Sequence, residues 1–445
     1  MPTVDVPVTW EVSTDEHFAT IAVTGSSVAT VQYAHSVHVV AAVPDGQLFY
    51  RFKAGGFVSP VGMTRCAPPA DAAVASVRFA SASCQNYENG FYAAHRDLAA
   101  QRPDFAVWLG DYIYEGAAGQ ITANANVRTH ATPEPKTVEA YRDRYALYKL
   151  DPDLQAAHAA CPWFVIWDDH EVENNYAGEN PQDPSEAASF PARRAAAYQA
   201  WWEHQPVALP PPPPSGEYRT YRALEWGTLM QLALLDTRQY RSDQACGDVT
   251  LTVTPPCPEV TAPGRTLTGT EQEQWFFDTL DANSRTWNVV GQQIVFSDAT
   301  FNGAILNYDQ WDGYPEQRQR IHQHLADHHT QNVVVLSGDI HLAGTGTVRN
   351  GDRATGQPIA VEFVATSISS DGLIPASLAG LVKSIPSLFD VELEHRGYII
   401  HTVTPARWLA EYRTVDDVKQ EASAVSVYQT YAIDSGTNTV RFAAA

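Results

Sequence analysis

The sequence has little positive charge for its length. Its 445 residues include 29 Lys and Arg against 51 Asp and Glu, which gives a formal net charge of −22. Such a chain lacks the basic surface with which general nucleic-acid-binding proteins hold a polyanion, so we expect no stable nucleic-acid partner. A phosphate substrate would instead have to be attracted by a local arginine cluster or by a bound metal.

Long apolar runs are also absent. The longest, WFVIWDD and NVVVLSGD, are strand-sized and end in carboxylates. Neither approaches the roughly 20 apolar residues of a membrane helix, so we predict a soluble chain with no transmembrane segment. The N-terminus has no charged n-region, no apolar h-region and no twin arginines, and so shows no export signal. A signal could have been removed from the chain.

Cysteine is scarce, with five residues at positions 66, 84, 161, 246 and 257. This odd number leaves at least one cysteine unpaired. Cys246 and Cys257 flank the turn-rich stretch CGDVTLTVTPPC, the kind of segment that a local disulfide staples in an oxidising compartment. We therefore predict this pair and a secreted, periplasmic or extracellular protein, while Cys66 and Cys161 have no assignable partners.

The composition is that of a packed protein with more than one domain. Hydrophobic residues make up 44% of the chain and charged residues 18%, which excludes wholesale disorder. Residues 4 to 63 alternate apolar and polar between turn-forming breaks, which predicts a small antiparallel β-sandwich. The Pro-rich PVGMTRCAPPAD at 60 to 71 is typical of a linker. We place the domains at 1–70 and 71–445.

From residue 77 the pattern changes to single apolar runs separated by helical stretches, which predicts a layered α/β or α+β core. The expected strands are VRFASAS, DFAVWLGD, WFVIWDD, LMQLALLD, WNVVGQQIVFS, NVVVLSGD, AVEFVATS and YIIHTVT. The expected helices are 90–101, 136–149, 186–204, 270–281 and 314–329.

Five of these regions end in side chains that can bind metal or phosphate. They are SCQN at 83–86, GDYIYE at 110–115, WDDHE at 167–171, LDTRQYR at 235–241 and SGDIH at 337–341. In open α/β sheets, the loops beyond the carboxyl ends of the strands carry such side chains into a shared crevice. The sequence therefore predicts one convergent site.

Each motif also has a structural interpretation. Asp111 after Gly110 could be a turn or N-cap aspartate, and Tyr114 could be core packing, although their spacing lets both reach one ion. Cys84 could be a small buried hydrophobe, a thiolate nucleophile or a soft metal ligand. Arg238 could simply brace the fold.

The WDDHE motif is harder to explain structurally. Adjacent like charges repel one another unless a cation or solvent offsets them, which favours a functional role. SGDIH repeats the arrangement, because Asp339 and His341 alternate and so project from one face of an extended segment, as ligands of neighbouring ions would.

At these motifs the chain resembles the alkaline phosphatase D (PhoD-like) family of metallophosphoesterases, which includes iron-dependent phosphodiesterases of the phospholipase D type. The similar segments run in family order across roughly residues 78 to 415. They are FASASCQN, WLGDYIYE, WDDHEVENNYAG, LLDTRQYR, NYDQWDGYP, VVLSGDIHLAG, FVATSISSDG and RGYIIHTVTPARW. Ordered motifs of this extent are far more specific than any one alone.

The resemblance implies an α/β (α+β) metallophosphoesterase-like β-sandwich core flanked by helices, with a small N-terminal fibronectin-III-like β-domain. No glycine-rich strand region precedes PVTWEV, where the family's N-terminal domain normally opens, so that domain could be truncated.

The resemblance also implies the ligands of a Fe³⁺ and Ca²⁺ centre. It makes Asp111 the bridging carboxylate, Cys84, Tyr114 and His341 iron ligands, and Asp339 a calcium ligand. In WDDHE it makes Asp169 a ligand of the second metal and His170 the catalytic histidine, while the role of Asp168 is less certain.

We therefore predict hydrolysis of phosphate monoesters by a metal-bound hydroxide, with Arg238 holding phosphate oxygens and His170 protonating the leaving oxygen or orienting the phosphate. The alternative is a phosphodiesterase or phospholipase D acting at the same centre on a lipid phosphoester. An apolar lip at 370–389 would favour it, although that stretch could equally be a buried helix pair. The candidate pocket walls are 116–135, 242–268 and 370–395. Two further alternatives are a Cys84-based thiol hydrolase and a non-enzymatic binding protein stabilised by metals.

Overall fold

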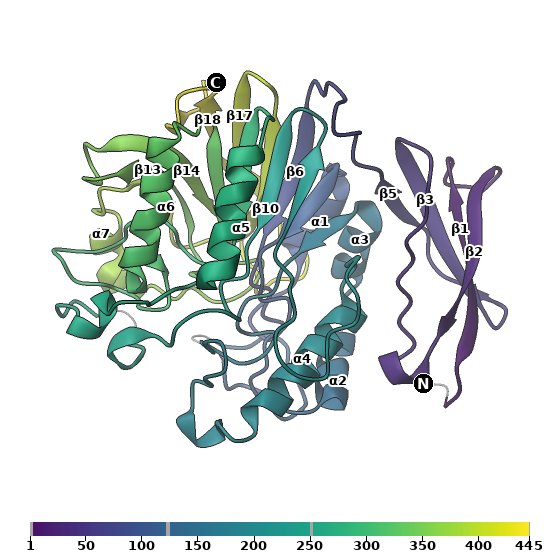
Figure 1. The fold of residues 1–445 in the computed structure, drawn as a ribbon. Helices are drawn as coiled ribbons and strands as arrows, with labels where there is room; N and C mark the ends of the chain where they lie inside the picture. The colour runs from purple at the N-terminus through teal and green to yellow at the C-terminus, as the bar shows by residue number, and fades with distance from the viewer. Residues whose placement is uncertain (1–2, 122–124, 250–251, 445) are drawn as a thin grey trace.

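The computed structural model describes residues 3–121, 125–249 and 252–444. Its strands form three sheets, of which one belongs to the N-terminal region and stands apart at the right of Figure 1. The two larger sheets, of seven strands each, make up the body of the molecule. Within the described residues, no helix has both the length and the apolar character needed to cross a membrane.

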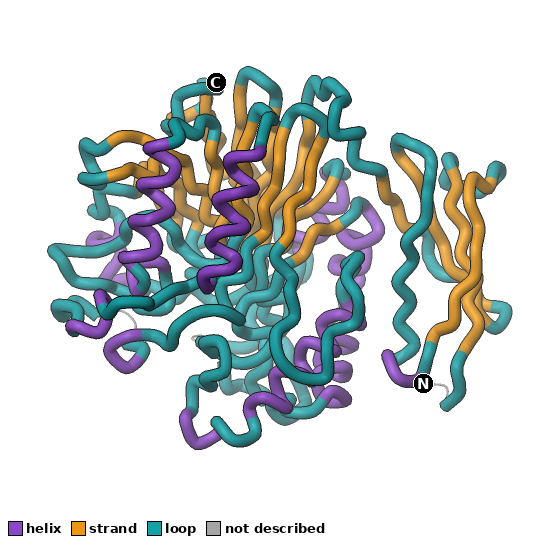
Figure 2. Tube along the Cα trace, viewed as in Figure 1, coloured by secondary structure: helices purple, strands orange, loops and turns teal. Residues whose placement is uncertain are grey.

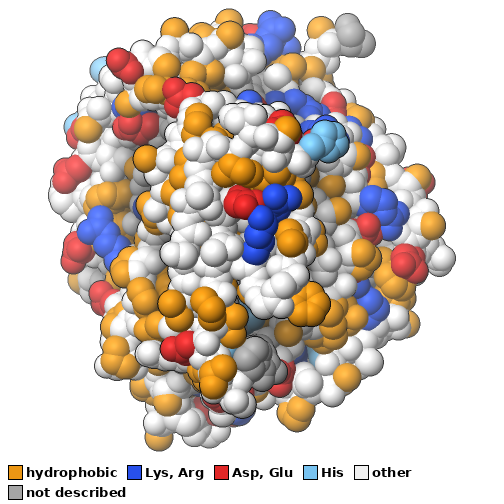
Figure 3. All heavy atoms as spheres, turned by 90° about the vertical axis from the view of Figure 1, so that its right-hand side faces the viewer, with side chains coloured by type: hydrophobic (Ala, Val, Ile, Leu, Met, Phe, Trp, Pro, Cys, Tyr) orange, Lys and Arg blue, Asp and Glu red, His pale blue; other side chains and the backbone are white. Residues whose placement is uncertain are grey.

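The described N-terminal residues form one five-stranded antiparallel sheet, in the order β2-β1-β3-β4 with β5 paired to β3, where the sequence predicts a β-sandwich of two sheets. Its strands are β1 (Val6–Ser13), β2 (Ile21–Ala29), β3 (Gln47–Ala54), β4 (Phe57–Val58) and β5 (Gly62–Arg65). The expected linker at 60–71 is wrong in its first half, because Gly62–Arg65 pairs with the start of β3 and so belongs to the sheet. The face that this region presents carries acidic and basic side chains interspersed (Figure 3), so no patch of one charge forms there.

The two seven-stranded sheets combine parallel centres with antiparallel edges. The first runs β15 (Leu388–Glu392), β13 (Ala343–Asn350), β14 (Gln357–Val364), β12 (Val333–Ser337), β11 (Trp287–Gly291), β10 (Met230–Leu234) and β9 (Arg222–Trp226). The second runs β19 (Arg441–Phe442), β18 (Val425–Asp434), β17 (Arg407–Val415), β16 (Arg396–Val403), β6 (Val77–Ala82), β7 (Phe105–Trp108) and β8 (Trp163–Val165).

A continuous apolar core joins the two sheets. Phe79 and Val107 of the second sheet lie in one buried cluster with Leu232, Val289 and Leu336 of the first. The parallel strands β10, β11 and β12, and β6, β7 and β8, are buried along nearly their whole length, as expected of strands covered on both faces. The core is therefore a β-sandwich.

Helices cover the outer faces of this sandwich (Figure 2). Those packed on the second sheet are α1 (Ala93–Gln101), α2 (Val138–Lys149), α3 (Pro152–Ala160) and α4 (Phe190–His204). Those packed on the first sheet are α5 (Gly269–Ala282) and α6 (Pro315–Asp327), while the single turn α7 (Ala379–Val382) lies before β15. All eight expected strands and all five expected helices are present, and the structure adds α3 and several antiparallel strands.

Candidate metal centre

The predicted residues converge beyond the carboxyl ends of the parallel strands. Cys84 follows β6, Asp111 and Tyr114 follow β7, and Asp169 follows β8. The ladder between β6 and β7 continues past both strands, since Cys84 N donates to Gly110 O at 3.1 Å and so places the thiol beside Asp111. An isolated bridge between Ser83 and Ser367 ties this edge to the segment that follows β14.

One donor group combines sulfur, oxygen and nitrogen. The ligand atoms of Cys84, Asp111 and His341 all lie within 4.8 Å of one another. The Tyr114 hydroxyl joins them, because it donates to Asp111 Oδ2 at 2.9 Å and lies 3.0 Å from His341 Nε2. Ser370 Oγ donates to the same hydroxyl at 2.9 Å. The four side chains that the resemblance implies around iron are thus adjacent.

His341 is oriented as a metal ligand. Its Nδ1 donates to the carbonyl oxygen of Asp371 at 2.6 Å, which leaves the lone pair on Nε2, the nitrogen that faces Tyr114. Burial lowers the pKa of the imidazole to about 3, so the ring is neutral, the form that binds metals.

Two further donor groups overlap the first. Asp111, Asp169 and His170 form one, and Asp168, Asp169 and Asp339 form the other, each with ligand atoms within 4.8 Å. Asp111 is shared with the first group, and Asp169 is common to the two further groups. The structure therefore brings together every metal ligand predicted from the sequence, and it places Asp168, whose role the sequence left less certain, beside Asp169 and Asp339.

Two carboxylate oxygens in this centre have no hydrogen-bond partner among the described residues. They are Asp111 Oδ1 and Asp169 Oδ1, both buried. Burial raises the pKa of Asp111 and Asp339 well above the usual range, and the neighbouring aspartates raise both further. Unsatisfied buried oxygens and crowded carboxylates are costly unless a cation offsets them, so the donor set fits bound metal ions.

The Cys84 thiol also fits a ligand better than a free nucleophile. Burial, and then the charge of Asp111, raises its pKa well above the usual range, and its Sγ donates to Ser83 Oγ at 3.2 Å. Without a cation this thiol stays protonated, whereas a cysteine nucleophile needs a lowered pKa.

The backbone at the centre adopts uncommon conformations. Cys84, Asp111, Asp339 and His341 all have φ between 52° and 67°, in the left-handed region. Gly110, just before Asp111, has φ 109°, and a Cβ there would lie 2.3 Å from the Cβ of Asp168. Only glycine allows the strand ends of β7 and β8 to approach this closely.

Glu171 and Glu115, which the sequence analysis left without a role, hold the centre in place. Glu171 accepts hydrogen bonds from the backbone N–H groups of Asp111 at 3.0 Å, Tyr112 at 2.7 Å and Asp168 at 2.9 Å, and so clamps the two loops together. Glu115 Oε2 lies 2.7 Å from His170 Nδ1. Both glutamates stand inside the quoted motifs, but only their spatial contacts reveal these functions.

Arg238, which the sequence predicts to hold phosphate oxygens, lies buried behind the centre and does not line the cavity described below. Its side chain is fully buried and pairs with Asp309 through two hydrogen bonds of 2.8 Å and with Asp168 through Nε. Asp169 and Asp339 lie within 3.6 Å of its Nη2. Because these carboxylates pair with the guanidinium group, the contacts of Arg238 fit the alternative interpretation of the sequence, in which this arginine stabilises the fold.

A cavity of about 380 Å³ opens onto the centre. Asp111, Asp169, His170, Asp339 and His341 line one part of it. Residues from all three predicted pocket walls line the cavity. They are Ile121 from 116–135, Asp248 and Val253 from 242–268, and the segment from Leu373 to Leu388 from 370–395. The last segment is therefore an apolar lip, and its helical content is limited to short turns.

The aliphatic side chains of this lip form what we call the aliphatic arm of the cavity. Its members are Ile374, Leu378, Leu381, Val382, Ile385 and Leu388. They face Val364 of β14, Leu342 just before β13 and Val295 in the loop that follows β11. No Lys or Arg among the described residues lines the cavity, so the cavity joins a metal-ligating end to an uncharged apolar end.

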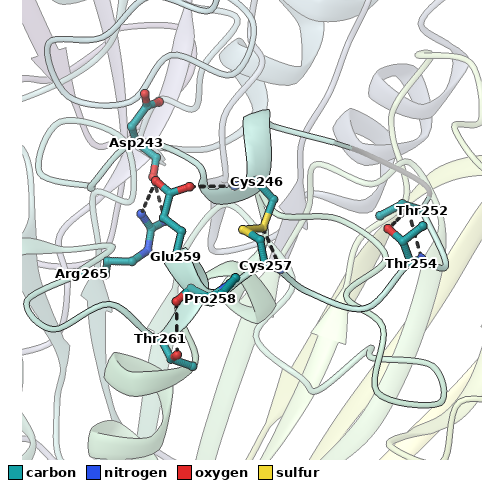
Figure 4. Close-up of a disulfide and its surroundings, with 9 residues drawn as sticks. All are labelled: Asp243, Cys246, Thr252, Thr254, Cys257, Pro258, Glu259, Thr261 and Arg265. Atoms are coloured by element: carbon teal, nitrogen blue, oxygen red, sulfur yellow. Dashed lines mark hydrogen bonds and ion pairs between the residues drawn. A yellow bond between two sulfur atoms is a disulfide. The ribbon is translucent and has the colours of Figure 1, made fainter.

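The predicted disulfide between Cys246 and Cys257 is present beside this cavity (Figure 4). Glu259 braces the loop, because it accepts a hydrogen bond from Cys246 N at 3.1 Å and lies 3.8 Å from Arg265. In the described parts of the chain, Cys66, Cys84 and Cys161 form no disulfide. The crosslink thus constrains the wall that carries Asp248 and Val253.

Comparison with known proteins gives consistent matches. Residues 79–412 match the family model described as PhoD-like phosphatase, and residues 2–68 match the model of the PhoD-like phosphatase N-terminal domain. The chain is 42% identical over 441 residues to alkaline phosphatase D of Bacillus subtilis (strain 168), a match that covers 97% of this chain and 75% of that protein. A solved structure described as the structure of PhoD superposes with a TM-score of 0.95 at 40% identity, covering 100% of this chain and 86% of that chain.

Proposed function

The chain belongs to the PhoD-like phosphatase family and is a phosphoric ester hydrolase, and from this premise we propose that it is a phosphomonoesterase that uses Fe³⁺ and Ca²⁺. The main observation in support of this proposal is that Asp111 belongs to two donor groups, one with Cys84 and His341 and one with Asp169 and His170. In that position Asp111 would contribute to holding two metal ions, which together would offset the negative charge of one phosphoryl group.

The residue types favour a different metal on each side of Asp111. Thiolate, phenolate and imidazole from Cys84, Tyr114 and His341 suit ferric iron, whereas Asp169 and Asp339 supply the oxygen ligands that calcium prefers. When bound, these metals supply Lewis-acid activation of water and positive charge opposite the phosphate.

His170 is the catalytic residue of the proposal. It lines the cavity, and Glu115 holds its Nδ1 at 2.7 Å, which leaves Nε2 free to face a substrate oxygen. The histidine would then donate a proton to the leaving oxygen. Arg238 is a positioning residue, because it orients Asp168 and Asp309 and offsets part of the charge behind the ligands.

The aliphatic arm favours a second candidate, a phosphodiesterase acting on esters with an apolar or lipid substituent. A phosphomonoester needs room for one substituent, whereas this cavity continues from the metal-ligating end along Leu381, Val382 and Ile385. Its volume lies within the range of small-ligand pockets, about 300–1,000 Å³.

Three further parts of the proposal rest on the chain as a whole. The Cys246–Cys257 disulfide supports a secreted, periplasmic or extracellular location. The small sheet over β1–β5 and the match of residues 2–68 to the family's N-terminal domain support a β-domain of 1–70 beside a catalytic domain of 71–445, and the fibronectin-III-like character of the first rests on the family resemblance alone. The two packed sheets with outer helices support a metallophosphoesterase-like core.

Elemental analysis of protein prepared without chelators, combined with activity measurements, tests the metal assignment. We expect iron and calcium together, visible charge-transfer absorption, and loss of activity on chelation. Tyr114→Phe should shift or bleach the absorption band. The matched control is Tyr112→Phe, because Tyr112 is equally buried but contacts His158 and not the centre.

Each alternative gives a distinct result in the same experiment. A Cys84-based thiol hydrolase would stay active after chelation. A binding protein would show no turnover even before chelation, and chelation would only destabilise it. A colourless, fully active protein without iron would refute the iron assignment.

Substrate chain length tests the second candidate. Nitrophenyl phosphate is compared with nitrophenyl alkyl phosphate diesters of increasing chain length. If the arm holds the alkyl group, kcat/KM should rise about fourfold per methylene until the arm is filled, from about 0.8 kcal/mol per buried CH₂. Leu381→Gln should flatten the series, whereas Lys383→Gln, on the exposed side of the same segment, should leave it unchanged. Turnover of the monoester alone would favour the phosphomonoesterase.

A further inference from the structure

We propose that Asp281, His324 and His328 form a second metal site on the molecular surface, for a borderline divalent transition-metal ion such as Zn²⁺, Cu²⁺ or Ni²⁺. Asp281 lies in the last turn of α5, and the two histidines lie at the C-terminal end of α6. None of the three lines the catalytic cavity. The proposal is therefore independent of the phosphoester chemistry.

The three side chains already converge. Asp281 Oδ1 lies 2.9 Å from His324 Nε2 and 2.8 Å from His328 Nδ1, and all three ligand atoms lie within 4.8 Å of one another. The imidazole rings stack with centroids 4.0 Å apart. Zinc binds histidine nitrogen and carboxylate oxygen at about 2.0–2.2 Å, so small side-chain rotations would place one ion between all three.

Helix geometry supplies the arrangement. His324 lies in the last turn of α6 and His328, four residues on, is the C-cap of that helix, so the two lie on the same side, one turn from each other. On α5, Phe277 and Asp281 have the same spacing, and the Phe277 ring stacks on His324 at 4.2 Å with an interplanar angle of 6°. The packing of one helix against the other thus fixes one imidazole in place before any ion binds.

The site is open to solvent on one side. The side chains of His328 and Asp281 are 48% and 39% exposed, whereas that of His324 is only 13% exposed. Asp281 and His328 also line a surface hollow with Asn283 and Thr330, where water can complete the coordination of an ion. Arg285 also lines that hollow, but its guanidinium pairs with Glu225 at 2.6 Å, which offsets its positive charge.

The donor set predicts which ions bind. A site of two imidazoles and one carboxylate should bind Cu²⁺ with the highest affinity, Zn²⁺ and Ni²⁺ with lower affinity, and Mn²⁺ weakly. Calcium prefers six to eight oxygen ligands and would not compete. The simpler interpretation is that protonated histidines form ion pairs with Asp281. That interpretation predicts no order among metals and no bound ion.

The test is titration of the holoenzyme, with its catalytic metals in place, with ZnCl₂ in the presence of excess Ca²⁺. Isothermal titration calorimetry should show one more equivalent of Zn²⁺ bound by the wild type than by His324→Ala/His328→Ala. Losing an outer-shell partner of a metal ligand costs about 10- to 100-fold in affinity, so each single histidine variant should lose at least that much. Zn²⁺ should also raise the Tm of the wild type but not that of the double variant.

The matched control is His329→Ala. His329 is exposed and adjacent to His328, but its side chain is outside the group. This variant should bind the same number of equivalents as the wild type, with the same affinity. Equal Zn²⁺ binding by the wild type and the double variant would overturn the proposal, and so would an equal loss of binding in His329→Ala.

Discussion

Gly110→Ala tests whether the close approach of two strand ends builds the metal centre. The position has φ 109°, and alanine in such a conformation costs about 1–2 kcal/mol. The new Cβ would also lie 2.3 Å from Asp168 Cβ and 2.7 Å from Asp168 N. No side-chain rotation relieves these contacts, so overpacking adds about 1–3 kcal/mol. We expect the free energy of unfolding to fall by about 2–5 kcal/mol.

The displacement should also reach the ligands, because Gly110 precedes Asp111 and contacts the loop that carries Asp168 and Asp169. The assays are urea denaturation followed by tryptophan fluorescence, metal content and kcat. The control is Gly216→Ala, which has a similar φ of 88° but no atom within 4 Å of the new Cβ, and therefore measures backbone strain alone. If Gly110→Ala is no more destabilising than Gly216→Ala and keeps its metals, the close approach is not what shapes the centre.

Four further predictions concern the proposed ligands, His170 and the removal of the metals. Asp111→Asn should lose both metals and nearly all turnover while the sheets stay folded, and retention of metals with substantial activity would exclude the bridging role. His170→Ala should keep both metals but lose kcat by about 10²–10⁴-fold on alkyl phosphates and much less on nitrophenyl esters, whose leaving groups need little protonation. Asp169→Ala should lose the second metal and lower kcat equally for both kinds of substrate. If His170→Ala also lost metal and lowered kcat equally for both, His170 would be a ligand and not a proton donor. Chelation should lower Tm, because ions that bind only the native state stabilise it by mass action; an unchanged Tm would show that the carboxylates tolerate one another without cations.

The parallel strands and their chemical ends were predictable because burial and function both leave signals in the sequence. A strand covered on both faces is a continuous apolar run, as in β12, and Asp339 and His341 follow it directly. The convergence of such ends is a general property of parallel sheets. The convergence of Cys84, Asp111 and Asp339 at one edge could therefore be predicted without knowledge of any contact.

Other elements depend on their neighbours and carry weaker signals. β13 (Ala343–Asn350) is rich in glycine and threonine and forms because β14 and β15 pair with it on both sides. Gly346 admits the backbone of Ser387, since a Cβ there would lie 2.2 Å from Ser387 O. By contrast, α3 could have been found, because Asp151 caps it and Pro152 occupies its first position.

The roles of Arg238 and Glu115 could not be predicted, because each depends on which partner reaches it in space. Arg238 follows a strand end, as the proposed ligands do, yet its guanidinium is hydrogen-bonded to Asp309, 71 residues further along the chain. Glu115 follows Tyr114 in the same motif, but His170 reaches it from another loop. Sequence order identifies the candidates for a site, and only tertiary contacts divide them into ligands, positioning residues and braces.

The centre combines several features that each destabilise the protein in the absence of cations. Cys84, Asp111, Asp339 and His341 hold left-handed backbone conformations, each of which costs about 1–2 kcal/mol. Asp111 and Asp169 each bury an oxygen without a hydrogen bond from any described residue. The surrounding structure tolerates these costs because the strands that present the ligands lie in an extensive apolar core between two sheets. If metal ions bind to this native arrangement and not to the unfolded chain, as we propose, the same residues that weaken the metal-free protein couple its stability to the occupancy of the centre.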